Sequence, residues 1–73
     1  MIEVRLFATL RDGRGKLRML EPESVSTAGD ILALLGIHPR EIAILLINGF
    51  HAKTDDTVKD GDVLALFPPV GGG

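Results

Sequence analysis

The chain has 73 residues, which is enough for one small domain built around a single core. It contains no cysteine, so disulfides, thiolate metal ligands and cysteine nucleophiles are excluded. The formal net charge is -2 and the Lys and Arg residues are scattered, which argues against binding to nucleic acid. No apolar run is long enough to span a membrane and the N-terminus lacks a signal-peptide pattern, so we expect a cytoplasmic protein without membrane contacts.

The first part of the sequence predicts two paired strands. Ile2, Val4, Leu6 and Ala8 alternate with Glu3, Arg5, Phe7 and Thr9, so residues 2–9 have the period of two of a half-buried strand. Turn residues follow at 12–15, and residues 16–20 predict a second strand with Leu17 and Met19 on one side. We expect these two strands to form an antiparallel pair.

A short helix is predicted over residues 28–35. Thr27 and Asp30 have the spacing of a capping box, and apolar side chains then recur at helical spacing from Ala28. Gly36 suits the left-handed position that ends a helix, and Pro39 prevents continuation. The helix therefore has about two to three turns, at 3.6 residues per turn.

The second half of the sequence predicts three more strands. Residues 42–47 form an apolar run, Asn48-Gly49 marks a turn, and residues 50–53 suit a short edge strand. Val58 is expected to enter the core from a loop, and residues 63–67 predict the last strand, which ends at Pro68-Pro69. This order of elements is typical of an α+β domain, in which the helix packs across a mixed sheet of four to five strands. We expect the first and last strands to be central neighbours.

The order of elements and the closing sequence Phe67-Pro68-Pro69-Val70-Gly71-Gly72-Gly73 resemble the MoaD/ThiS family of ubiquitin-like, β-grasp sulfur carriers. Residues 2–8, Asn48-Gly49 and residues 59–63 also resemble the small subunit of molybdopterin synthase. The resemblance covers essentially the whole chain. It implies a β-grasp domain over residues 1–67 and an extended C-terminal tail over residues 68–73.

The resemblance implies that the working group is the C-terminal carboxylate of Gly73. An α-carboxyl group has a pKa of about 3.3–3.7, so it is ionised and a poor electrophile at neutral pH. In this family a ubiquitin-activating-type adenylyltransferase uses ATP to adenylate the carboxylate, which a sulfur nucleophile then converts into a thiocarboxylate. We expect no stably bound cofactor. The tail residues that would thread the active site of a partner are Pro68, Pro69, Val70, Gly71 and Gly72.

The strand alternation predicts an apolar patch beside the tail. Side chains that point away from the helix alternate with core side chains along each strand, and an exposed apolar patch indicates a partner surface. The patch is predicted to contain Phe7, Ile44, Leu46, Ala65 and Phe67. The alternative is that a loop or the tail covers one of the two Phe side chains.

The sequence offers no convincing metal or catalytic site among its side chains. His38 and His51 have no ligand spacing, and Asp55, Asp56, Asp60 and Asp62 lack the closing Glu of a calcium loop. Lys16, Lys53 and Lys59 are expected to be surface charges, or acceptors if the protein is conjugated to itself. We therefore expect a protein that is not an enzyme alone.

Four functions remain open at this level. The leading hypothesis is a sulfur donor in molybdopterin biosynthesis, with the large subunit of molybdopterin synthase as its partner. A second is sulfur donation to the thiazole of thiamine, with thiazole synthase as partner, or to another sulfur metabolite. A third is a ubiquitin-like protein modifier joined to target lysines through Gly73. The last is an interaction module with an inert tail.

Overall fold

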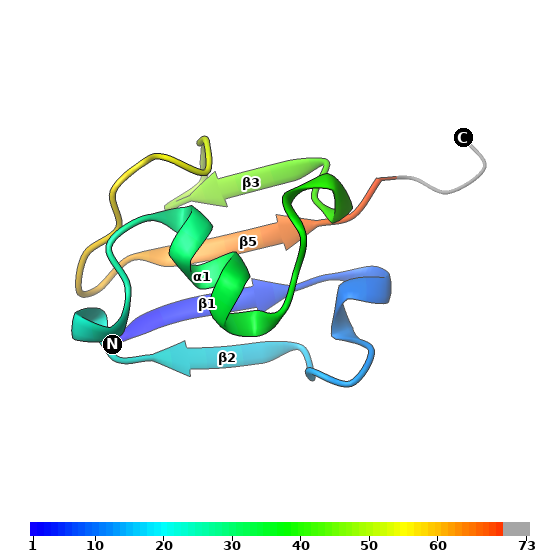
Figure 1. Cartoon of the computed structure of the whole chain (residues 1–73), viewed down its shortest axis with the longest axis horizontal. Coiled ribbons are helices and arrows are strands. Elements are labelled where there is room, and N and C mark those ends of the chain that lie inside the picture. The colour runs from blue at the N-terminus through cyan, green and yellow to red at the C-terminus, as the bar shows by residue number, and fades with distance from the viewer. Residues whose placement is uncertain (70–73) are drawn as a thin grey trace.

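The computed structural model describes residues 1–69, and residues 70–73 lie outside the described part. Within these described residues, five strands form one mixed sheet in the order β2-β1-β5-β3-β4, and one α-helix packs across one face of it (Figure 1). The elements are β1 (Ile2–Leu6), β2 (Leu17–Leu20), α1 (Ala28–Leu35), β3 (Ile44–Ile47), β4 (Phe50–His51) and β5 (Val63–Phe67). The predicted α+β architecture and the central position of the first and last strands are confirmed.

The last strand, β5, is the middle strand of the sheet. It runs parallel to β1, with Leu6 opposite Leu66, and antiparallel to β3, with Leu45 opposite Leu66. The pair β1–β2 is antiparallel, as predicted. Because β5 lies between β1 and β3, the chain beyond Phe67 leaves from the middle of one end of the sheet, opposite the N-terminus (Figure 1).

Helix α1 begins and ends as its sequence predicts. The Thr27 hydroxyl accepts a hydrogen bond from the Asp30 backbone N–H at 3.2 Å, and the Asp30 carboxylate accepts one from the Thr27 N–H at 3.0 Å. This capping box satisfies N–H groups that lack partners in the first turn. At the other end Gly36 has a φ of 72°, and the Ile37 N–H donates to the Leu32 carbonyl at 2.8 Å.

The core lies between the sheet and α1. Central strands β1 and β5 contribute completely buried side chains, and α1 covers them with its apolar face. Val58 is buried from a loop, as predicted, whereas the buried positions of Leu10 and Ile37 were not predicted. The core residues are Ile2, Val4, Leu6, Leu10, Leu20, Val25, Ala28, Ile31, Leu32, Leu35, Ile37, Leu45, Val58, Leu64 and Leu66.

Each strand except β5 is shorter than predicted, and for β1 the reason is the pairing partner. In the parallel ladder the Phe7 N–H donates to the Leu66 carbonyl at 3.2 Å, but the next donor would be Pro68, which has no N–H. The Phe7 carbonyl instead accepts from the Leu10 N–H at 3.2 Å, within the 3₁₀ turn η1 (Ala8–Arg11). The predicted strand over residues 2–9 therefore ends at Leu6.

The side chain of Arg14 ties the β1–β2 connection to the end of α1. Its guanidinium donates to the carbonyls of Leu35 at 3.1 Å, Gly36 at 3.2 Å and Leu10 at 3.1 Å. The last carbonyls of a helix lack intrahelical partners and carry a partial negative charge. Arg14 therefore satisfies two of these groups at the C-terminal end of α1.

The carboxylate of Asp62 ties the β3–β4 turn to the start of β5. This carboxylate is only 4% exposed and accepts hydrogen bonds from Asn48 Nδ2 at 3.0 Å and from the Lys59 N–H at 2.9 Å. The Asn48 Oδ1 accepts in turn from the Val63 N–H at 3.0 Å. Burial opposes ionisation, yet the two hydrogen bonds hold the pKa of Asp62 below its ordinary value.

Within residues 1–69, α1 and the shorter helical turns offer nothing with the length and apolar character needed to cross a bilayer.

Candidate functional site

The tail begins where the backbone pairing of β5 ends. The Phe67 carbonyl accepts the last hydrogen bond to the neighbouring strand, from the Ala43 N–H at 2.8 Å. Pro68 and Pro69 follow, and neither has an N–H to continue either ladder. The sheet therefore releases the chain at Pro68, and the fixed φ of the two prolines stiffens its first two residues.

Two aromatic rings stack at this point. The rings of Phe7 and Phe67 have centroids 4.3 Å apart and are inclined by only 12°. The stack follows from the register, because Phe7 comes one residue after Leu6, which pairs with Leu66. Ala8 then has a φ of 54°, an uncommon value for a residue with a Cβ, and it turns the chain into η1 immediately beside the stack.

The five residues of the predicted patch all lie on the outer face of the sheet, away from α1. In the ladder between β3 and β5, Ile44 is opposite Phe67 and Leu46 is opposite Ala65. Ile44 is 40% exposed, and the other four are half-buried. The half-buried rings of Phe7 and Phe67 stack on each other. Arg11, from the connection between β1 and β2, lies over the Phe7 ring, so the alternative of a covering loop applies in part to Phe7.

A hollow opens at the base of the tail, and we call it the tail-root hollow. Its volume is about 440 Å³ and its lining is mostly apolar. It is lined by Phe7, Ala8, Thr9, Ile44, Phe67, Pro68 and Pro69. The structure thus brings together three patch residues and two tail residues, whereas Leu46 and Ala65 lie farther along the outer face.

Sequence reasoning missed residues that belong to the same outer face. Leu17 pairs with Arg5 and Met19 pairs with Glu3, so both apolar side chains of β2 point outward and are about half exposed. Arg5 and Glu3 form an ion pair on this face. The alternation within β2 predicts a shared side for Leu17 and Met19, but only the register with β1 shows that it is the outer side.

Arg11 was also missed, although its place beside the stack is well defined. Its Nε donates to the Leu6 carbonyl at 2.8 Å, and its Cζ lies 5.5 Å from the centroid of the Phe7 ring. This is a cation–π arrangement. No sequence motif indicates it, because the contact depends on the turn at Ala8 and on η1.

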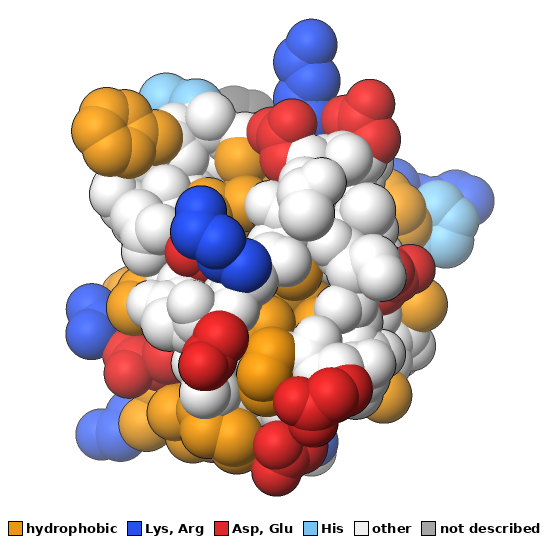
Figure 2. Space-filling model, turned by 90° about the vertical axis from the view of Figure 1, so that its left-hand side faces the viewer, with side chains coloured by type: hydrophobic (Ala, Val, Ile, Leu, Met, Phe, Trp, Pro, Cys, Tyr) orange, Lys and Arg blue, Asp and Glu red, His pale blue; other side chains and the backbone are white. Residues whose placement is uncertain are grey.

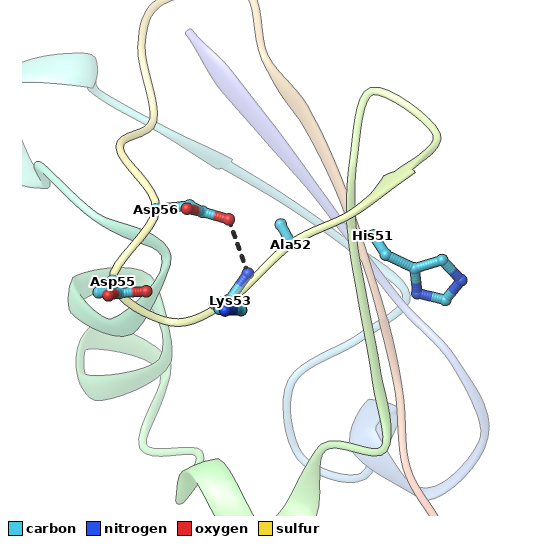
Figure 3. A pocket seen from close by; sticks show the side chains of 5 residues that line it. All are labelled: His51, Ala52, Lys53, Asp55 and Asp56. Atoms are coloured by element: carbon cyan, nitrogen blue, oxygen red, sulfur yellow. Dashed lines mark hydrogen bonds between the residues drawn. The ribbon is translucent and has the colours of Figure 1, made fainter.

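A further hollow lies at the other end of the molecule and is lined by His51, Ala52, Lys53, Asp55 and Asp56 (Figure 3). The only hydrogen bond drawn there runs from the Lys53 backbone N–H to Asp56 Oδ2, at 2.8 Å. The imidazole of His51 points away from the two carboxylates (Figure 3). Among residues 1–69, no three His, Asp or Glu side chains gather closely enough to hold a metal ion.

Four of the predicted tail residues, Val70, Gly71, Gly72 and Gly73, lie outside the described part of the chain. Their roles remain predictions. The described geometry concerns what surrounds the tail at its base, namely the stacked rings, the tail-root hollow and the apolar outer face.

Comparison with known proteins shows which family the chain resembles. The model of the ThiS family matches residues 4–73, nearly the whole chain. Small archaeal modifier protein 1 of Haloferax volcanii is 34% identical, over 99% of this chain and 100% of that protein. Its crystal structure has a TM-score of 0.76 and covers 99% of this chain and 98% of its own.

Two other solved structures share the fold. The solution structure of the HVO 2177 protein of Haloferax volcanii is 30% identical with a TM-score of 0.76, covering 99% of this chain and 85% of that one. A complex of subunits 1 and 2 of the molybdopterin-converting factor from Helicobacter pylori contains a chain that is 23% identical, with a TM-score of 0.66. It covers 99% of this chain and 97% of that one, and at this identity it supports the fold alone. The chain therefore belongs to the ThiS family of ubiquitin-like, β-grasp proteins, whose members are small modifiers or sulfur carriers.

Proposed function

We propose that this protein is a sulfur carrier whose working group is the carboxylate of Gly73. The observation that carries the proposal is the release of the tail from the central strand β5, at two prolines that cannot pair and beside an exposed apolar face. The family match, which runs to Gly73, supports the same reading. Because the described chain leaves the middle of the sheet at Pro68, residues that follow can enter a partner while the domain docks outside.

The Gly73 carboxylate is converted into a thiocarboxylate in two steps. In the first, an oxygen of the Gly73 carboxylate attacks the α-phosphate of ATP, and an acyl-adenylate and pyrophosphate form. In the second, a hydrosulfide ion (HS⁻) attacks the acyl carbon, the C–S bond forms, the bond between the acyl carbon and the phosphate oxygen breaks, and AMP leaves. The product is a thiocarboxylate. Because these steps need ATP and a sulfur source from other enzymes, the carrier supplies no acid, base or metal and is not an enzyme alone.

The outer face is the proposed docking surface for these enzymes. The first partner is a ubiquitin-activating-type adenylyltransferase. The second is the enzyme that consumes the sulfur, either the large subunit of molybdopterin synthase or thiazole synthase. Three side chains would contact them close to the tail, namely Phe7, Ile44 and Phe67, and two farther along β3 and β5, namely Leu46 and Ala65. The need for ATP and for these enzymes favours a cytoplasmic location.

We place donation to molybdopterin first among the sulfur pathways, on the sequence resemblance to the small subunit of molybdopterin synthase. The solved complex of subunits 1 and 2 of the molybdopterin-converting factor contains a domain of this fold bound to a partner subunit. It concerns that protein, and it supports the proposal here only through the shared fold.

A second candidate function is protein modification, in which Gly73 is joined to a lysine of a target through an isopeptide bond. The observation that favours it is the 34% identity with small archaeal modifier protein 1 over nearly the whole chain. Both functions share the adenylation step, and they differ in the nucleophile that displaces AMP. Sulfur gives a thiocarboxylate, and a lysine amine gives an amide.

The test is ATP–pyrophosphate exchange with the adenylating enzyme of the same organism, followed by intact mass measurement of the carrier. Wild-type protein should support exchange, and a variant that lacks Gly72 and Gly73 should not, although its thermal melt should match that of the wild type. After incubation with a sulfur donor, one oxygen should be replaced by sulfur. Exchange at the wild-type rate by the truncated protein would refute the proposal, and lysine-linked adducts without thiocarboxylate would favour the modifier.

A further inference from the structure

Phe7 lines two hollows that differ in the charge of the residues around them. The tail-root hollow on one side is mostly apolar. On the other side lies a second hollow of about 300 Å³, whose lining surface is also mostly apolar. Its lining residues are Leu6, Phe7 and Leu17, the cationic Arg5, Arg11 and Lys16, and Glu3. We call it the basic hollow. The two hollows are therefore neighbours, and both lie beside the place where the chain leaves the sheet.

Most of the positive charge in the basic hollow has no counterion among residues 1–69. Glu3 pairs with Arg5. Among the described residues, neither Arg11 nor Lys16 forms an ion pair with a carboxylate. Both cations are therefore able to pair with a carboxylate that a partner supplies.

Arg11 is already held in position for such a contact. Its Nε is bound to the Leu6 carbonyl and its guanidinium lies by the Phe7 ring, so part of its rotamer freedom is lost before binding. Within the described residues, only its Nε donates a hydrogen bond, and its two terminal nitrogens remain available as donors. A guanidinium that presents two terminal nitrogens suits a carboxylate better than an ammonium does.

The charge of the whole molecule is unevenly distributed along its length. Segments 7–16 and 36–43 lie at the end where the tail leaves (Figure 1), and their charged residues are Arg11, Arg14, Lys16 and Arg40 against Asp12 and Glu41. Segments 21–26 and 52–62 lie at the opposite end, with Glu21, Glu23, Asp55, Asp56, Asp60 and Asp62 against Lys53 and Lys59. Figure 2 views this opposite end, where acidic side chains lie at several places. An acidic partner would therefore attract the tail end first.

We propose that the partner site that receives the tail places an acidic side chain in the basic hollow, against Arg11 and Lys16, and an apolar side chain in the tail-root hollow. The Phe7 ring would stand between them. This inference rests on the proposed function and adds the chemistry of the partner, namely an apolar centre with an acidic rim. Charge complementarity at such a rim raises the association rate and fixes the orientation of docking. The rival occupant is the acidic end of a second copy of this chain.

The test compares Arg11→Glu with Arg18→Glu in the pyrophosphate-exchange assay with the adenylating enzyme of the same organism. Arg18 is also an exposed cation, in β2, but it pairs with Val4 and so lies on the helix side of the sheet. At low salt we expect Arg11→Glu to raise the KM for the carrier about tenfold or more and to flatten its dependence on salt. At about 0.15 M salt the KM of Arg18→Glu should stay within about twofold of the wild type, because a charge outside the docking surface acts only at long range and is screened beyond about 8 Å.

A second matched pair, Lys16→Glu and Lys53→Glu, keeps the test decisive if Arg11→Glu fails to fold in a thermal melt. Equal KM values within each folded pair, with an active wild type, would overturn the inference and leave the proposed function intact. An inactive wild type would refute the proposed function and this inference with it. If light scattering instead shows dimers of the free protein that Arg11→Glu dissociates, while KM is unchanged, the occupant is a second copy and the inference is wrong.

Discussion

Replacing Leu66 by Ala would test whether the core-facing side chains of β5 contribute more to the free energy of unfolding than the side chains on its outer face. Leu66 has no solvent exposure and lies in the middle strand, opposite Leu6 on one side and Leu45 on the other. Buried Leu→Ala substitutions cost about 2–5 kcal/mol, and the cost is greatest where the surroundings cannot collapse into the space. Because neighbouring strands and α1 enclose this position, we expect about 3–5 kcal/mol.

This loss is large for so small a domain. Stabilities of about 0.05–0.15 kcal/mol per residue correspond to about 4–11 kcal/mol for a chain of this size. Leu66→Ala should therefore remove roughly half of the free energy of unfolding, and lower Tm by at least about 10 °C, at about 4–8 °C per kcal/mol for small domains. Urea unfolding followed by circular dichroism measures the change directly, provided that the m-value is unchanged.

The matched control is Phe67→Ala, the next residue of the same strand. Phe67 is half-buried on the outer face, where it stacks on Phe7 and lies opposite Ile44. An aromatic pair contributes about 0.5–1.5 kcal/mol beyond the area that it buries, so the loss should be clearly smaller than for Leu66. Comparable losses in the two variants would show that Phe67 is part of the core, and would refute the outer face as a free docking surface.

Two further predictions concern the side chains that hold the loops. Arg14→Ala should lower the free energy of unfolding by about 1–3 kcal/mol, since three carbonyl groups lose their donor. The control Arg18→Ala should change it by less than about 0.5 kcal/mol. Equal effects of the two substitutions in urea unfolding would contradict the role of Arg14 at the end of α1. For Asp62, burial opposes ionisation, but the hydrogen bonds hold its pKa below the unfolded value. The Asp62 carboxylate therefore stabilises the fold above about pH 3.9, and this stabilisation is lost as the pH falls through the pKa of the folded state. Asp62→Asn should therefore show a weaker loss of stability than the wild type between neutral and acidic pH, and identical pH profiles would exclude this role.

Short patterns in the sequence were sufficient to predict the helix, the orientation of β5 and the end of strand pairing. The capping box of Thr27 and Asp30 and the left-handed Gly36 bound α1 as predicted, because each involves atoms only a few residues apart. The alternation in β5 predicted which of its side chains face the core, since successive side chains of a strand point to opposite faces. Pro68 and Pro69 marked the end of pairing because they lack the N–H that every ladder needs.

Tertiary structure alone decided how these elements meet. The stack of Phe7 on Phe67 joins residues from opposite ends of the chain and depends on the parallel register of β1 and β5. The positions of Arg11 beside Phe7 and of Arg14 at the end of α1 depend on the path of η1, which forms because Pro68 leaves the Phe7 carbonyl without its strand partner. No periodic pattern or motif in the sequence predicts such contacts, because the two residues in each contact depend on elements that are far apart along the chain.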